Sequence, residues 1–261
     1  MENKKIIGID INEVIRSRSM QFDRFYYEEF DGKGLPPEDD PYKFDLRNDY
    51  KWEDGEETLE YLNEDLPDDI SPKDYVIDKN TGKAPVDVFA FKKEKKLITG
   101  DEKFKRFMYE DYLFEIHGTA PPIYKGLDKH LEKFYLKYRD QFELRIISKE
   151  NWFTIPPTLF FLSKMMLRFT DFKFVKNNTE VWENVDILIT TDPELLECPD
   201  NKKVVKINRP YNKNIESKVV ALQVYDLIDN KEFQELIGYI EPKVSLEENN
   251  NNNSENIKEN E

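Results

Sequence analysis

Residues 4–10 read KKIIGID, a short apolar run that is rich in β-branched side chains and ends in the carboxylate of Asp10. A run of this kind is typical of a buried parallel strand that leads into a loop. The next segment, residues 19–30, carries apolar and aromatic side chains at helical spacing and is followed by Gly32 and Gly34. It predicts a helix packed on the strand, because aromatic side chains at this spacing usually form core.

Strand and helix patterns alternate again after residue 101. Helices are predicted at residues 104–118, 126–138 and 156–169, with one or two more within 219–240. Strands are predicted at residues 142–148, 172–175, 185–190 and 204–208. Buried strands separated by helices predict an α/β fold, with a Rossmann-like, mostly parallel sheet covered by helices on both faces.

Residues 35–100 do not follow this alternation and are rich in Pro, Asp, Glu and Tyr. Within them, residues 74–78 and 86–91 flank the turn sequence NTGK, which predicts a β-hairpin. We expect residues 35–100 to form an insertion beside the main sheet. The core is then formed by residues 1–34 and 101–244.

The composition excludes several classes of protein. Acidic residues outnumber basic ones by 54 to 39, and the net charge of −15 disfavours binding to nucleic acids and anionic membranes. The single cysteine, Cys198, cannot form an intramolecular disulfide, and no apolar run is long enough to span a bilayer. Residues 245–261 are a low-complexity stretch dominated by Glu and Asn, which predicts a disordered tail. We expect a cytoplasmic protein without a nucleic-acid or membrane partner.

Polar side chains follow the predicted strands. Ligands of parallel α/β sheets bind at the carboxyl ends of the strands, so these side chains are the candidate site residues. The residues at the strand ends are Asp10 and Asn12, Ser148 and Lys149, Lys176, and Thr191 and Asp192. In chain order they present a carboxylate, a hydroxyl, a lysine and a second carboxylate.

This order resembles the four motifs of the haloacid dehalogenase-like superfamily. The segment GIDINEVIR, residues 8–16, is similar to the DxDGV-like loop of that family, with Asp10 at the nucleophile position and Asn12 at the position of the second aspartate. The RPYN of residues 209–212 resembles a PYN near the end of the deoxyribonucleotidase-type phosphatases and their bacteriophage-encoded relatives.

The resemblance covers residues 4–44 and 101–212. It implies a haloacid dehalogenase-like α/β fold, in which an insertion after the first motif often covers the site. Residues 35–100 are therefore expected to be cap-like.

The chemistry of the family implies a role for each matched residue. A carboxylate attacks phosphorus, a second carboxylate protonates the leaving group, and magnesium and a lysine neutralise the developing charge. By resemblance, Asp10 is the nucleophile and a magnesium ligand, and Asn12 stands at the acid position and offers its backbone carbonyl to the metal. Ser148 hydrogen-bonds a phosphoryl oxygen, Lys176 pairs with the phosphate and with Asp10, and Asp192 holds the metal. The implied cofactor is Mg²⁺.

Three residues depart from the family pattern. Asn12 cannot act as a carboxylic acid, which removes a contribution of about 10²–10⁴-fold in rate. Thr191 stands where the first of two adjacent aspartates is usual, and its loss weakens a magnesium site that prefers anionic oxygens. Glu13 replaces a glycine and places an acidic side chain near the phosphate position. The site therefore resembles a phosphatase site that has lost part of its acidic machinery.

Each site residue also has a structural alternative. Asp10 and Ser148 can cap helices, and Lys176 can be a solvated loop residue. Asp192 precedes Pro193 and can simply begin a helix. Taken singly, these residues favour the structural roles, and only their order as a set favours a site.

Two functions follow from the resemblance. The first, favoured by the missing acid, is a degenerate, non-enzymatic member with a binding or assembly role, in one form a bacteriophage virion component. Its partners are then proteins, further copies of the chain, or a small phosphorylated ligand, in the host cytoplasm or the virion. The second is a magnesium-dependent phosphatase or 5′-nucleotidase that acts on deoxynucleoside monophosphates through an aspartyl-phosphate.

Overall fold

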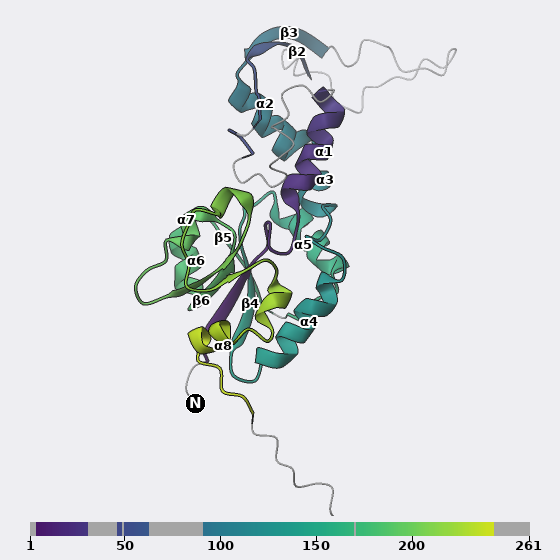
Figure 1. Ribbon diagram of the computed structural model, residues 1–261. Coiled ribbons are helices and arrows are strands. Elements are labelled where there is room, and N and C mark those ends of the chain that lie inside the picture. Colours follow the sequence, from purple (N-terminus) through teal and green to yellow (C-terminus); the bar gives the residue numbers. More distant parts are fainter. Residues whose placement is uncertain (1–3, 31–45, 49, 63–90, 170, 243–261) are drawn as a thin grey trace, which may run out of the picture. The chain divides into compact units, whose positions relative to one another are not determined.

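The computed structural model describes residues 4–30, 46–48, 50–62, 91–169 and 171–242, which fall into two compact units (Figure 1). The first unit comprises Met1–Ile15, Tyr124–Lys149 and Leu167–Glu261, and the second comprises Arg16–Ile123 and Glu150–Met166. These boundaries do not coincide with the predicted core of 1–34 and 101–244. Helices from residues 16–123 and 150–166 pack with one another in the second unit.

A six-stranded parallel sheet forms the centre of the first unit, in the order β5-β4-β1-β6-β7-β8. The strands are β1 (Ile6–Asp10), β4 (Glu143–Lys149), β5 (Asp171–Val175), β6 (Ile187–Thr190), β7 (Lys203–Ile207) and β8 (Val220–Ala221). The predicted α/β class and parallel sheet are confirmed. The short β8 was not predicted, and lies where the sequence pattern favoured helix.

The first strand lies at the middle of this sheet, between β4 and β6. Ile9 is aligned with Ile146 on one side and with Ile189 on the other. A side chain at Gly8 would bring its Cβ within 2.5 Å of Val185 Cγ1, so glycine allows the close packing here. Because the strands are parallel and in register, the residues that follow β1, β4 and β6 lie at the same edge of the sheet.

Two helices of the first unit, α4 (Leu127–Tyr138) and α8 (Lys231–Ile237), match predicted ones, and α6 (Asn178–Asn184) was not predicted. The others are α7 (Pro193–Leu196) and the 3₁₀ turns η3 (Pro210–Asn212) and η4 (Val224–Leu227). Residues 219–240 thus contain a strand and a 3₁₀ turn before their one α-helix. Among the described residues, no helix has both the length and the apolar character needed to cross a membrane.

The second unit is built around aromatic side chains. Its elements are α1 (Arg18–Phe30), the antiparallel pair β2 (Gly55–Leu62) and β3 (Phe91–Ile98), α2 (Gly100–Arg106), a π-turn η2 (Phe107–Asp111), α3 (Leu113–Gly118) and α5 (Ile155–Lys164). Phe22 and Tyr26 of α1 pack with Phe107 and Tyr50, which confirms the predicted core role for these two side chains, whereas Met20 and Tyr27 of the same helix are exposed.

One predicted helix of the second unit ends early, and two other predicted segments lie outside the described residues. The helix predicted at 156–169 ends at Lys164, and Met166 has a left-handed φ of 48° that no continuing helix can contain. The predicted hairpin strands 74–78 and 86–91 lie outside the described residues, apart from Phe91 at the start of β3. The predicted tail 245–261 also lies outside them.

A buried ion pair holds the start of α1 to α5 and to the segment before it. The guanidinium of Arg16, which is fully buried, donates to Glu150 Oε1 at 2.9 Å, to Thr158 Oγ1 at 2.8 Å and to the carbonyl of His117 at 2.6 Å. Glu150 Oε2 accepts from Thr154 Oγ1 at 2.6 Å. Both charged groups therefore have hydrogen-bond partners, as buried charges require.

Candidate functional site

The ends of β1, β4 and β6 bring four of the predicted site residues to one edge of the first unit's sheet. Asp10 ends β1, Asn12 follows it, Ser148 lies in β4, and Asp192 lies two residues beyond β6. Asn12 Nδ2 donates to Ser148 Oγ at 3.4 Å, which joins the loop after β1 to the end of the neighbouring strand β4. The strand-end rule thus placed these residues correctly relative to one another.

Asp10 is a buried carboxyl with a perturbed acidity. Its Oδ2 accepts a hydrogen bond from Thr190 Oγ1 at 2.8 Å, and the side chain is nearly excluded from solvent. Burial, followed by the negative charge of Asp192, raises its pKa to about 7, although Thr190 and the positive charge of Lys149 act in the opposite direction. At neutral pH a large fraction of Asp10 therefore carries a proton.

Asp192 is held by groups of the protein on both of its oxygens. Oδ1 accepts from the backbone N–H of Glu194 at 2.9 Å, as the N-cap of α7. Oδ2 lies 2.5 Å from Lys149 Nζ. The structural alternative for Asp192, that it begins a helix, is therefore confirmed, and the ion pair with Lys149 is an additional contact.

The lysine beside the two carboxylates is Lys149, at the end of β4. Lys176 follows β5, which is separated from β1 by β4, and its side chain is exposed. The backbone N–H of Lys176 donates to Glu180 Oε2 at 3.0 Å, at the start of α6. Of the two lysines, Lys149 is therefore the one whose strand adjoins β1, and Lys176 follows a strand one position further out.

Four side chains form what we call the lysine cluster: Lys149, Asn178, Asp192 and Glu194. Besides Asp192, Lys149 Nζ contacts Asn178 Oδ1 at 2.7 Å and lies 3.6 Å from Glu194 Oε2. Asn178 Nδ2 in turn donates to Glu194 Oε2 at 3.0 Å. The ammonium group is therefore surrounded by acceptors of the chain itself.

The backbone carbonyl of Asn12 also accepts a hydrogen bond, in addition to the one that its side chain donates. The carbonyl of Asn12, which the resemblance offers to a metal, accepts from Thr191 Oγ1 at 3.3 Å. Glu13, the next residue, has a left-handed φ of 59° and is buried. This bent loop brings the replaced positions 12 and 191 into direct contact with each other.

The RPYN segment, residues 209–212, hydrogen-bonds to the backbone of the loops that follow β1 and β6. Arg209 Nη2 donates to the carbonyl of Glu13 at 2.8 Å, and Asn212 Nδ2 donates to the carbonyl of Thr191 at 2.9 Å. The backbone N–H of Arg209 donates to Asn212 Oδ1 at 2.9 Å. Arg209 and Asn212 therefore position both site loops, a role that the quoted motif alone did not indicate.

The residues at this edge do not fit a magnesium ion. Magnesium requires several hard, preferably anionic oxygens in octahedral arrangement. Both oxygens of Asp192 and the carbonyl of Asn12 already accept hydrogen bonds or an ion pair within the chain. In the described part of the chain, no group of three or more His, Cys, Asp or Glu side chains is arranged to hold a metal. The predicted Mg²⁺ site is thus not supported by the donor set.

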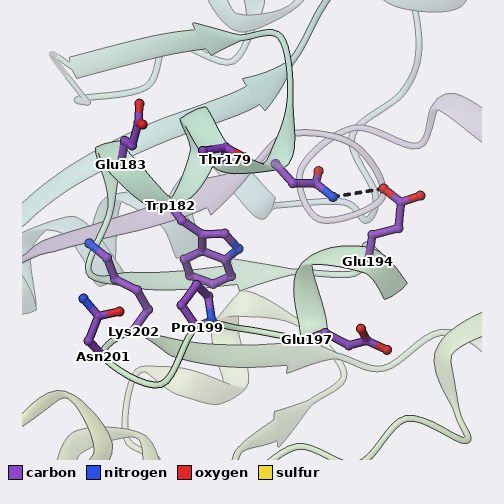
Figure 2. A pocket seen from close by; sticks show the side chains of 9 residues that line it. Thr179, Trp182, Glu183, Glu194, Glu197, Pro199, Asn201 and Lys202 are labelled. Atoms are coloured by element: carbon purple, nitrogen blue, oxygen red, sulfur yellow. Dashed lines mark hydrogen bonds between the residues drawn. The ribbon is translucent and has the colours of Figure 1, made fainter.

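A surface pocket of about 480 Å³ lies next to the lysine cluster (Figure 2). Trp182 forms one wall, and Glu183, Glu194 and Glu197 lie around it with Lys202. Lys202 Nζ donates to the carbonyl of Val185 at 2.7 Å, so its charge is partly directed at the backbone. The lining is acidic, which opposes the binding of a phosphorylated ligand.

No protein-family model and no curated protein matches this chain. The assignment of a function therefore depends on the residues of the site.

Proposed function

We propose that the sheet edge formed by β1, β4 and β6 is a degenerate phosphatase-type site of the haloacid dehalogenase kind, used for binding or assembly and not for hydrolysis. The observation that carries this proposal is that the polar groups of the site form hydrogen bonds and ion pairs with one another. Asn12, at the acid position, donates to Ser148, and Lys149 is held by Asp192 and Asn178. The groups that phosphoryl transfer requires are thus replaced or already bound to each other.

The state of Asp10 supports the same proposal. A carboxylate nucleophile must be ionised, and a pKa of about 7 leaves about half of Asp10 protonated at neutral pH. The leaving group also needs an acid, and an amide at position 12 has no proton of suitable acidity to donate. The missing acid at position 12 is therefore the larger impairment, and the partial protonation of Asp10 adds a smaller one.

The strand order supports the proposed relationship to this fold. The strand that ends in Asp10 lies between the strand that carries Ser148 and the strand that precedes Asp192. This is the neighbourhood that the resemblance implies for its first, second and fourth motifs. The cap-like role of residues 35–100 remains part of the proposal, since most of that segment lies outside the described residues.

The chemistry of the surroundings favours a protein partner or a second copy of the chain over a phosphorylated ligand. The chain has a net charge of −15, and the pocket beside the lysine cluster is acidic. Both features repel phosphate groups. An assembly role, of which a virion component is the form that the resemblance to bacteriophage-encoded relatives implies, requires no phosphate binding.

One observation favours the second candidate, a slow magnesium-dependent phosphatase or 5′-nucleotidase. Lys149 supplies a positive charge that acts on Asp10, although Lys176 does not occupy that place. An ion-paired lysine can be released when a phosphate competes for it. Activity measurements separate the two candidates.

We expect wild-type protein with magnesium to release phosphate from an aryl phosphate and a panel of deoxynucleoside monophosphates no faster than its Asp10→Asn variant. The reason is that the acid is absent and Lys149 is bound to Asp192. The measurement is colorimetric phosphate release at several pH values above 7, where Asp10 is ionised. Turnover by the wild type that Asp10→Asn abolishes would establish the phosphatase and contradict the proposal. A double variant, Asn12→Asp with Thr191→Asp, reports whether both missing carboxylates restore Asp10-dependent turnover.

A further inference from the structure

The contacts of Lys149 differ from those of a surface ion pair. Its partner Asp192 has a side chain that is only 5% exposed, whereas Lys149 itself is 29% exposed. Asn178 and Glu194 add two acceptors around the same ammonium group. A positive charge held by three side chains next to a buried carboxylate is a fixed part of the site and not a mobile surface group.

The neighbouring carboxylates create the need for such a charge. Lys149 Nζ lies 2.5 Å from Asp192 Oδ2, and Lys149 lines the same small cavity as Asp10. The negative charge of Asp192 raises the pKa of Asp10, and the positive charge of Lys149 lowers it. In a metal-dependent site, a divalent cation relieves this kind of repulsion. Here the oxygens available to such a cation already face the ammonium group and backbone or hydroxyl donors.

We propose that the Lys149 ammonium group is a built-in counter-cation, which replaces a magnesium ion between Asp10 and Asp192 and makes the fold of the first unit independent of metal. This inference rests on the proposed function insofar as the edge is taken as a phosphatase-type site. It goes beyond it by naming the residue that replaces the metal, and it holds whether or not the protein is an enzyme.

The inference predicts a latent metal site that appears when the lysine is removed. In Lys149→Met, a buried carboxylate loses its counter-charge, and we expect the Tm in EDTA to fall by about 6–12 °C. Magnesium chloride at millimolar concentration is expected to restore part of that loss, because Asp10 and Asp192 can then share the ion. The Tm of the wild type is expected to be the same in EDTA and in magnesium.

Three variants serve as controls in the same thermal unfolding experiment. Lys149→Arg keeps the charge and should remain insensitive to magnesium. Lys149→Met with Asp192→Asn removes the second carboxylate and should lose the magnesium response. Lys176→Met removes an exposed lysine and should change neither the Tm nor its response to magnesium.

The outcomes decide the inference independently of activity. A wild-type protein that binds magnesium in isothermal titration, or whose Tm rises with it as much as that of Lys149→Met, overturns it. A folded Lys149→Met that ignores magnesium also overturns it, and if that variant does not fold, the wild-type titration still decides. Asp10-dependent turnover without a magnesium response refutes the proposed function alone, whereas magnesium binding without turnover refutes this inference alone.

Discussion

Replacing Arg16 by methionine is expected to lower the free energy of unfolding of the second unit by about 3–5 kcal/mol. The substitution leaves the carboxylate of Glu150 buried without its charged partner, and breaking a buried pair in this way is strongly destabilising. It also leaves the carbonyl of His117 without the guanidinium donor that it now has at 2.6 Å. This is one of the largest effects that a single substitution outside the aromatic core should have.

Chemical denaturation followed by tryptophan fluorescence measures this effect. Trp52 and Trp152 belong to the second unit and Trp182 to the first, so a Trp182→Phe background isolates the signal of the second unit. The double variant Arg16→Met with Glu150→Leu should recover much of the loss, because no charge is then left buried. Arg24→Met, which breaks an exposed pair with Glu28, should change stability by less than about 1 kcal/mol. An equally small effect of Arg16→Met would contradict the buried network.

Asp10→Asn is expected to make the protein more stable than the wild type at pH 8 by an amount on the order of 4 kcal/mol. The pKa of Asp10 is raised from 3.8 to about 7 on folding, and each pH unit between the two values corresponds to about 1.4 kcal/mol. Because the folded-state pKa is the higher one, the stabilisation from the protonated carboxyl is complete below pH 3.8. It is lost as the pH rises through about 7. Asparagine has no such titration and can still accept from Thr190.

The test is the pH dependence of the difference in unfolding free energy between Asp10→Asn and the wild type, measured in EDTA. This difference should increase from pH 5 towards pH 8 and then level off above the pKa of about 7. Thr190→Val is a useful comparison, since removing a donor to the ionised carboxylate should raise the pKa further. A difference that does not change with pH would mean that Asp10 has an ordinary acidity.

Much of the first unit could be predicted from the sequence because its signals are local. The run KKIIGID and the runs that became β4, β5, β6 and β7 are short, apolar and followed by polar residues. Parallel strands bring their carboxyl ends together, so the relative placement of Asp10, Ser148 and Asp192 followed from strand assignment alone. The replacement of the family's second aspartate by Asn12 could also be read from the sequence, because it depends only on residue type.

The lysine of the site could not be predicted in the same way. Choosing between Lys149 and Lys176 requires knowing which strand adjoins β1, and strand order is a long-range property that a local pattern does not contain. Residue types in the chain order of the resemblance favoured Lys176. The adjacency of Ser148 and Lys149 in one strand was the available signal, and Asn178, the second acceptor of the lysine, had none.

Other features were missed because tertiary contacts override local preference. Arg16 follows an apolar run and looks like a surface residue, yet it is fully buried because Glu150 and Thr158 surround its guanidinium. The helix predicted to reach residue 169 ends at Lys164, where the backbone turns left-handed at Met166. Neither glycine nor proline marks that end in the sequence, so the pattern gave no sign of it.

The most direct test of the central claim is a search for the aspartyl-phosphate itself. Wild-type protein and Asp10→Asn are incubated with magnesium and an aryl phosphate, quenched in acid, and analysed by intact-protein mass spectrometry. Without an acid at position 12, an acyl phosphate once formed would also be hydrolysed slowly and would accumulate, so the measurement is sensitive to even one turnover. We expect no phosphorylated species in either protein. A phosphorylated wild type, with the modification absent from Asp10→Asn, would show that Asp10 is a working nucleophile and that the site is not degenerate.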